Sequence, residues 1–399
     1  MAKRMSADRT ESLSIPGSNP QAADAQALKP DLPSRSATEY LTNIRWVTVC
    51  IVVAYHVCYI FNGVGILGSI PGSQSLPFFD TCAAAVYPWF MVLLFLVAGM
   101  DSFYALQKYS LRQWLKSRTI KLLLPSTAGL FVWQWITGYL TLRAAGTLET
   151  IPAGIRWLVM ALSGTGPLWF VQTLYLYSLV LALLKKLGWI DRLQKACGAM
   201  RFWMVLLCGL LLYAAGFIGN LPVLTMYRLG IYGMVFVLGY CVFSHLSIQD
   251  KIEKNWKELA ILAAALGIIW TADFYGKAFS DLAILENPLT VAYLWFACLA
   301  VLGIFKKFFN FQTAFTRRMA ADSYGIYILH YSVLYAFGYL FVQILHLSVW
   351  WQYLLLLLLV YPATLAVYEI LKRIPVIRLL VLGISSGKAA GQPAKHPAA

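Results

Sequence analysis

The sequence has too few charged residues to coat a water-soluble protein of its size. Only 12% of its 399 residues are charged, whereas 60% are hydrophobic. The mean hydropathy of the chain is strongly positive. A soluble fold needs more polar surface than this composition supplies. The composition therefore predicts that the chain folds within a membrane, and the lipid bilayer is the first partner that we expect.

Cysteine is scarce, and its spacing shows no pattern. The seven cysteines include no CxxC pair, and most stand inside apolar segments: Cys50, Cys58, Cys82, Cys197, Cys208, Cys241 and Cys298. This arrangement indicates neither a disulfide framework nor a metal cluster. We expect these residues to contribute to packing, and we predict no metal and no permanently bound cofactor.

The N-terminal segment lacks the apolar core of a secretory signal. Residues 1–38 are polar and rich in Ser, Pro and Ala, which predicts a disordered cytoplasmic tail. Residues 39–384 are predicted to form a single transmembrane domain, and residues 385–399 a second disordered cytoplasmic tail. The domain shows no internal repeat and no inverted symmetry, features that are frequent in transporters.

Acidic residues are also few, which leaves a net charge of +15. A nucleic-acid-binding protein would gather its basic residues on one face or arm, with aromatic residues between them. Here the basic residues fall between apolar runs instead. The distribution therefore predicts no nucleic-acid binding.

Long apolar runs recur along the chain. A helix needs about 20 apolar residues to cross a bilayer, because lipid cannot satisfy exposed backbone groups. Ten segments fit this requirement: Ile44–Phe61, Thr81–Gln107, Leu122–Leu142, Leu168–Leu184, Phe202–Ile218, Leu229–His245, Leu259–Tyr275, Leu289–Phe305, Ser323–Val342 and Trp350–Leu371. The predicted fold class is all-α, a polytopic membrane helix bundle of about ten transmembrane helices.

Lysine and arginine predict the orientation of this bundle, because cytoplasmic loops carry the excess of basic residues. With ten spans, 27 of the 32 basic residues fall on the side of the two termini and four on the other side, while Arg45 lies within the first span. Inserting or deleting one span would scramble this sorting. Both termini are therefore predicted to be cytoplasmic.

Two ionisable residues, Arg45 and His56, stand in the first predicted span. Ionisable groups within a bilayer are costly and often functional. Their separation of eleven residues is about three helical turns, so they share one face and lie about 16 Å apart along the axis. Two simpler interpretations remain open: Arg45 as an anchor at the inner interface, and His56 as a partner in an interhelical hydrogen bond.

Five segments, in order, resemble motifs of the acyltransferase-3 superfamily of integral membrane O-acyltransferases, which includes glucan succinyltransferase-like and O-antigen acetyltransferase-like proteins. Arg45 and His56 match its Arg-x10-His spacing. The other matches are FLVAGMDSF to its FxxSG segment, KSRTIKLLLP to its RxxR loop, GPLWFVQTLYLY to its LWFL helix and SYGIYILHYS to its SYxIYLxH segment.

The sequence departs from the family pattern at four places. Thr42 stands where the family commonly has the Asp of DxxR, and Ala98 replaces the Ser before Gly99. Lys121 replaces the second arginine of RxxR, which keeps the charge but loses a guanidinium fork. Pro167 and Leu168 stand where a polar residue often precedes the LWF segment.

The resemblance implies transfer of an acetyl or succinyl group from a cytosolic acyl-CoA, a co-substrate. The acceptor would be a hydroxyl of an exported glycan, glycolipid or lipid-linked precursor. The resemblance also implies a multi-pass protein of the bacterial inner (cytoplasmic) membrane. A second copy of the chain is a further candidate partner.

The same resemblance implies roles for individual residues. We expect His56 to act as general base, since a low-dielectric cavity favours the neutral imidazole; an acyl-histidine intermediate is the less favoured variant. Arg45 would hold a donor phosphate or the developing oxyanion.

Further residues fall into two predicted groups. The donor-binding group is Arg118, Lys121 and His330; topology determination is an equal alternative for the first two, and a structural hydrogen bond for His330. The cavity-lining group is Trp169, Tyr324 and Tyr327, for which ordinary packing is the alternative. Asp101 and Asp322 are expected to be counter-charges for nearby basic residues.

Two other functions remain open. A multi-pass transporter or flippase for a glycolipid or small anion would use Arg45 and His56 to bind and relay its cargo. A non-catalytic membrane partner of a polysaccharide assembly complex is the third interpretation. An enzyme would consume acyl-CoA, whereas a transporter or a non-catalytic partner would not.

Overall fold

The computed structural model describes residues 38–66, 68–220 and 226–385, and both predicted tails lie almost wholly outside these ranges. Within them the backbone is helical and forms no strand beyond one isolated bridge. The helices in the first half are α2 (Glu39–Tyr59), α3 (Pro77–Val86), α4 (Phe90–Lys108), α5 (Leu111–Arg118), η2 (Thr119–Leu123), α6 (Leu124–Gly129), η3 (Leu130–Gln134), α7 (Trp135–Ala144), η4 (Leu148–Thr150), α8 (Ala153–Ser163) and α9 (Leu168–Lys186). Those in the second half are α10 (Trp189–Cys197), α11 (Phe202–Ala215), α12 (Leu229–Cys241), α13 (Leu246–Lys254), α14 (Trp256–Asp273), α15 (Leu282–Leu285), α16 (Pro288–Phe308), α17 (Ala314–Tyr339), η5 (Leu340–Ile344), α18 (Val349–Leu371) and α19 (Pro375–Leu382).

This helical architecture confirms the predicted fold class of a polytopic membrane bundle. All ten predicted segments fall mainly on helical backbone. Six helices among the described residues are long and apolar enough to cross a membrane, or seven if the bent pair of α12 and α13 forms one span. The count of ten spans and the cytoplasmic location of both termini stay predictions.

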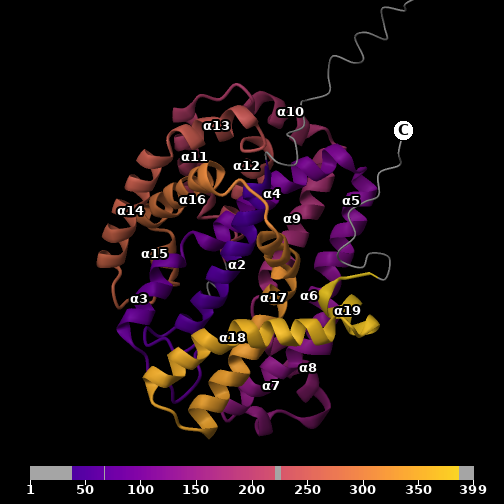
Figure 1. Cartoon of the computed structure of the whole chain (residues 1–399), viewed down its shortest axis with the longest axis vertical. Coiled ribbons are helices and arrows are strands. Elements are labelled where there is room, and N and C mark those ends of the chain that lie inside the picture. The colour runs from indigo at the N-terminus through magenta and orange to yellow at the C-terminus, as the bar shows by residue number, and fades with distance from the viewer. Residues whose placement is uncertain (1–37, 67, 221–225, 386–399) are drawn as a thin grey trace, which may run out of the picture. The chain divides into compact units, whose positions relative to one another are not determined.

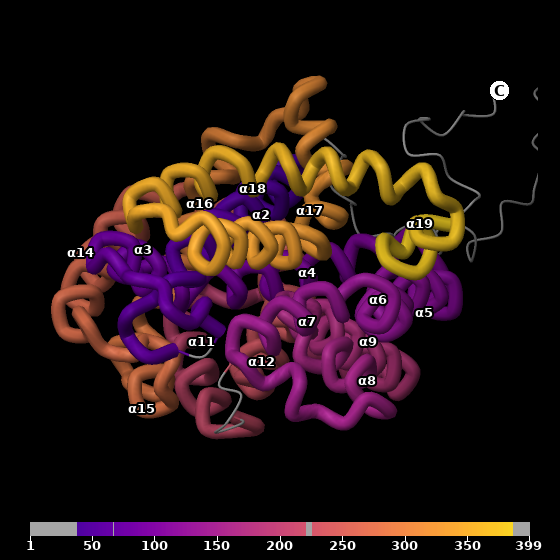
Figure 2. The backbone as a smooth tube through the Cα atoms, turned by 90° about the horizontal axis from the view of Figure 1, so that it is seen from below, coloured from indigo at the N-terminus to yellow at the C-terminus, as the bar shows by residue number. Residues whose placement is uncertain are grey.

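Three helices occupy the centre of the bundle. Figures 1 and 2 show α2, α4 and α17 between two groups of helices, with α5 to α9 on one side and α3, α14 and α15 on the other. Helix α2 packs against α17, α16, α18, α3 and α4. Residues on α2 therefore lie at the junction of the two groups, where a buried site can form.

Glycines bring α4 and α12 into close contact. A Cβ atom on Gly99 would overlap the carbonyl oxygen of Phe236, and one on Gly239 would overlap the carbonyl oxygen of Leu96. Small residues allow membrane helices to approach until their backbones touch. The glycine of the FLVAG segment thus fixes the position of α4, the helix that carries Asp101.

We expect Gly99→Ala to destabilise this helix pair by about 1–3 kcal/mol, the usual cost of adding a methyl group to a packed interface. Thermal unfolding of the purified protein in detergent measures the effect as a lower midpoint. Gly154→Ala on α8 is the matched control, because a Cβ at Gly154 would meet nothing within 4 Å. Equal unfolding midpoints for the two variants would contradict the proposed packing role.

Candidate functional site

Helix α2 carries the first two site residues on one continuous stretch of backbone. It runs unbroken from Glu39 to Tyr59 and includes both Arg45 and His56. The predicted separation of about three turns therefore holds. The helix places a cation near its N-terminal end and an imidazole near its C-terminal end.

His56 meets a second histidine, His330, which α17 supplies. The distance from His56 Nδ1 to His330 Nε2 is 3.2 Å, and the ring centroids are 5.0 Å apart. His56 Nδ1 also lies 2.8 Å from the carbonyl oxygen of Val52, one turn earlier on α2. His330 is fully buried, and its Nδ1 lies 2.7 Å from the carbonyl oxygen of Tyr327.

These contacts assign the protons of the pair. A carbonyl oxygen only accepts, so Nδ1 of each histidine carries the hydrogen and donates it. In its neutral form His330 then presents the lone pair of Nε2 to Nδ1–H of His56. His56 in turn keeps the lone pair of its own Nε2, and no hydrogen bond from the described residues occupies that atom. The arrangement leaves one imidazole nitrogen able to accept a proton.

Tyrosine rings surround the histidine pair. Tyr331 lies edge-on to His56 with ring centroids 5.1 Å apart, and Tyr55 lies 5.0 Å away. The Tyr331 ring also packs against Gly166, where an added Cβ would lie 2.9 Å from the ring. The imidazole of His56 therefore sits in an aromatic enclosure built by α2, α17 and the turn before α9.

A cavity of about 870 Å³ lies on the N-terminal side of His56. Arg45, Arg118 and Lys121 line it, and apolar side chains such as Val49 and Phe170 line it as well. Neither His56 nor His330 is among the lining residues. Since Val49 precedes His56 by seven residues, about 10 Å of helix separates the lining from the imidazole.

Arg45 has two partners at this cavity. Its Nη1 donates to Asp101 Oδ2 at 2.7 Å, and its Nη2 donates to Thr42 Oγ1 at 3.1 Å. Thr42 stands where the resemblance leads one to expect a carboxylate, and Asp101 on α4 supplies the negative charge in its place. The predicted role of Asp101 as a counter-charge is confirmed; Asp322 likewise pairs with Arg318.

Arg118 is the least solvated cation of the cavity. Its Nη2 donates to the hydroxyl of the buried Ser102 at 3.2 Å, and its guanidinium lies 5.4 Å from the ring centroid of Trp114. Desolvation lowers the pKa of Arg118 from its ordinary value, while the nearby Asp101 carboxylate raises it. An arginine stays protonated under such shifts, so Arg118 offers a partly desolvated positive charge to an anion.

A break in regular α-helix shapes the cavity wall at Lys121. Residues Thr119–Leu123 form a π-helical turn, η2, a feature that is frequent at functional sites. Pro125 has no N–H to donate to the carbonyl four residues earlier. The hydroxyl of Tyr324 donates to that carbonyl of Lys121 instead, which joins α17 to the wall.

The structure places the other predicted residues in two different environments. Tyr324 and Tyr327 line the cavity, and Tyr327 donates to the carbonyl of Pro167 at 2.7 Å. Trp169 does not line it: its ring packs against Phe95, Phe170 and Tyr232. His330 also lies outside the cavity of Arg118 and Lys121, because α17 turns it toward His56.

Two residues of the site were not singled out from the sequence. Tyr331 contacts His56, and Ser102 contacts Arg118. Tyr331 directly follows His330, so the sequence offered that one signal. Ser102 carried none, because a lone serine on an apolar helix is most often a local hydrogen-bonding residue.

Comparison with known protein families identifies the family of the chain. A family model described as "Acyltransferase domain" (acyltransferase-3) matches residues 38–369. The match covers every site residue above and most of the chain. Comparisons with curated proteins and with solved structures give no match. The chain is therefore a multi-pass membrane protein that belongs to the acyltransferase-3 family.

Proposed function

We propose that this protein transfers an acetyl or succinyl group from cytosolic acyl-CoA to a hydroxyl of an exported glycan, glycolipid or lipid-linked precursor. His56 is the general base of the reaction. The observation that carries this proposal is the histidine pair, in which Nδ1 of His56 is held by two acceptors while Nε2 keeps its lone pair. We place the protein in the bacterial inner membrane.

The basic cavity supports acyl-CoA as the donor. CoA carries several phosphates, and guanidinium and ammonium groups are their usual partners. Arg45, Arg118 and Lys121 meet in the cavity, and its volume lies in the range of ligand pockets. Apolar side chains line its inner part, which suits the arm of CoA. The thioester end would extend about 10 Å beyond Val49 to reach His56.

Of the two roles expected for Arg45, donor binding fits better than oxyanion stabilisation. Arg45 lies about 16 Å from His56 along α2, too far to contact a carbonyl that reacts beside the imidazole. It shares the cavity with Arg118 and Lys121 instead. We therefore assign the phosphates of the donor to all three cations.

The reaction follows from the protonation state of the pair. Nε2 of His56 takes the proton of the acceptor hydroxyl, whose oxygen forms a bond to the thioester carbonyl carbon. The tetrahedral intermediate collapses with cleavage of the C–S bond, and the proton on His56 passes to the leaving sulfur. His330 Nε2 accepts from the imidazolium while it exists. The products are the acylated acceptor and free CoA.

Consumption of acyl-CoA tests the proposal directly. We expect the purified protein in lipid nanodiscs to release CoA slowly from radiolabelled acetyl-CoA or succinyl-CoA without acceptor, because water can replace the hydroxyl. If neither thioester is bound or consumed, the acyltransferase proposal is wrong. Movement of a glycolipid or small anion across proteoliposomes would then support the transporter interpretation.

His330→Ala tests whether His330 positions His56. Loss of one charge-assisted hydrogen bond, worth about 1.5–3 kcal/mol, should lower kcat by about 10- to 100-fold and leave the donor KM nearly unchanged. His330→Gln keeps an acceptor near Nε2 and should restore most of the rate. If His330 were only structural, His330→Ala should lower the amount of folded protein in parallel with the rate, and His330→Gln should not restore the rate.

A further inference from the structure

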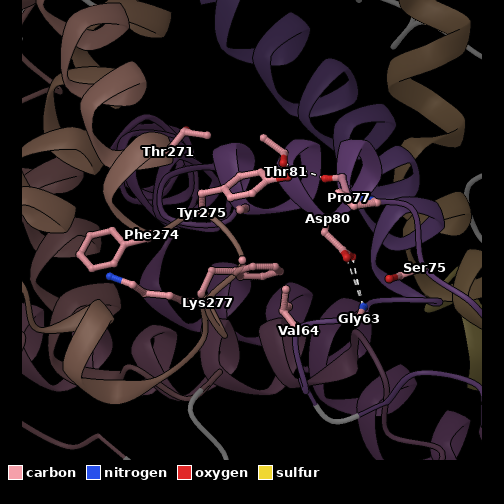
Figure 3. A pocket seen from close by; sticks show the side chains of 13 residues that line it. Gly63, Val64, Ser75, Pro77, Asp80, Thr81, Thr271, Phe274, Tyr275 and Lys277 are labelled. Atoms are coloured by element: carbon pink, nitrogen blue, oxygen red, sulfur yellow. Dashed lines mark hydrogen bonds between the residues drawn. The ribbon is translucent and has the colours of Figure 1, made fainter.

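A second pocket lies at the opposite end of α2 from the basic cavity. It has a volume of about 230 Å³ and is lined by α3, the end of α14 and the loops after α2 and α14. Figure 3 shows Asp80 and Ser75 on one side of this pocket, and Phe274 and Lys277 on the other. Polar and charged side chains are among its lining residues, including Ser75, Asp80, Thr81 and Lys277.

Asp80 is the central polar group of this pocket. Asp80 is only 8% exposed, and its carboxylate accepts from the Gly63 N–H at 3.2 Å. No lysine or arginine of the described chain lies within ion-pair distance of it. A carboxylate has about four acceptor positions. The Gly63 N–H and the Ser75 hydroxyl occupy part of them, so Asp80 keeps capacity for ligand hydroxyl groups.

An apolar groove adjoins the pocket. Its volume is about 720 Å³, and small residues of α3 and α14 line it, among them Ala85, Ala264 and Gly267. Tyr293 of α16 forms its floor and donates to the carbonyl of Ala85 at 2.7 Å. On α14, Ile268 of the groove is 71% exposed, as expected for a surface that meets lipid chains.

The pocket and the groove share two residues, Thr271 and Tyr275. A polar compartment therefore continues into an apolar one along the end of α14. A ligand that fills both has a hydroxylated head and a hydrocarbon chain. The exposed Lys277 at the pocket adds a positive charge, which suits a phosphate between head and chain.

The pocket and the basic cavity lie on opposite sides of His56 along the chain. Gly63, in the pocket, follows His56 by seven residues, whereas Val49, in the basic cavity, precedes it by seven. The imidazole thus lies about 10 Å along α2 from Val49, and only three residues of α2 separate it from the loop that carries Gly63. A donor can approach from one side and an acceptor from the other.

We propose that the Asp80 pocket and the adjoining α14 groove bind the acceptor, and that this acceptor is a lipid-linked molecule. Its hydroxylated head lies against Asp80, and its hydrocarbon chain lies in the groove beside Ala264. The acceptor enters sideways from the membrane. This inference rests on the proposed function and narrows its acceptor from glycans in general to molecules with a lipid anchor.

Photo-crosslinking of the full chain in nanodiscs tests the site. The probe is a polyprenyl-phosphate-linked glucose with a diazirine near the start of its chain, and phosphatidylglycerol with the same diazirine is the second arm. We expect the glucose-bearing probe to label residues 256–273, and unlabelled polyprenyl-phosphate glucose to remove the label. Equal labelling by both lipids without competition would show an ordinary lipid surface only and would overturn the proposal.

Substitutions in groove and pocket sharpen this test. Ala264→Trp should abolish the competed label by filling the groove, whereas Ala265→Trp is the control, because Ala265 is an exposed neighbour that does not line it. Ala272→Trp replaces Ala264→Trp if the latter does not fold. Asp80→Asn should weaken competition by polyprenyl-phosphate glucose by about tenfold. Normal competed labelling in both tryptophan groove variants would contradict the site.

The assay separates this inference from the proposed function. Labelling needs no donor, so it reports lipid binding even if the chain consumes no acyl-CoA. Conversely, the groove variants should release CoA from acyl-CoA at the wild-type rate when no acceptor is present. Loss of that release in a folded Ala264→Trp variant would mean that the groove serves the donor side, and the assignment to the acceptor would be wrong.

Discussion

His56→Ala should lower the rate of acyl-CoA consumption by about 10²- to 10⁴-fold, the range that a positioned general base contributes. In the folded protein Nε2 of His56 is the nitrogen that keeps a lone pair, and alanine removes it. The neighbouring His330 should replace it poorly, because its Nδ1 is committed to the carbonyl of Tyr327 and the lone pair of its Nε2 points at the position that His56 vacates, one imidazole ring short of the acceptor hydroxyl. The effect should fall on kcat, while the donor KM changes little.

His346→Asn is the matched control for the loss of an imidazole. His346 is exposed and has a positive φ of 49°, a conformation that asparagine tolerates. We expect its rate to equal that of the wild type. A His56→Ala protein that is folded, binds donor and consumes acyl-CoA at the wild-type rate would remove His56 from the mechanism.

The apolar pattern predicted the helices well, because length and hydropathy are local properties of the sequence. It could not predict where those helices bend or loosen. The segment Leu122–Leu142 looked like one uniform span, yet it contains part of η2 and all of η3, two π-helical stretches. The segment Leu229–His245 leads into a bend of 106° between α12 and α13. Such irregularities depend on tertiary partners such as Tyr324.

The geometry of α2 was predictable from the sequence, but the contacts of the candidate site were not. Spacing on α2 placed Arg45 and His56 on one face, because an unbroken helix has a fixed pitch. The contact between His56 and His330 spans 274 positions, and only the packing of α17 on α2 creates it. The same packing explains why His330 lies outside the cavity that Arg118 and Lys121 line. Trp169 does not line the cavity, because its neighbour Phe170 occupies the cavity side of α9.

Arg118→Ala should raise the KM for acyl-CoA by about 10- to 100-fold and change kcat less. Hydrogen bonds to charged groups contribute about 1.5–3 kcal/mol, and each 1.4 kcal/mol is a tenfold change in affinity. The partly desolvated guanidinium of Arg118 is screened less by salt than a surface charge. Wild-type KM should therefore depend only moderately on ionic strength. Arg118→Lys should fall between wild type and alanine, because lysine keeps the charge but loses the planar fork.

The control for this prediction lies on the same helix. Arg112 of α5 is exposed and does not line the cavity, so Arg112→Ala removes the same charge without removing a proposed contact. If both alanine variants raised the donor KM equally, the net charge of the cytoplasmic face would explain the effect, and Arg118 would have only a topological role. A rise confined to Arg118→Ala would instead identify a direct contact. Because Arg45 already pairs with Asp101 at 2.7 Å, we expect Arg118 to contribute more to donor affinity than Arg45.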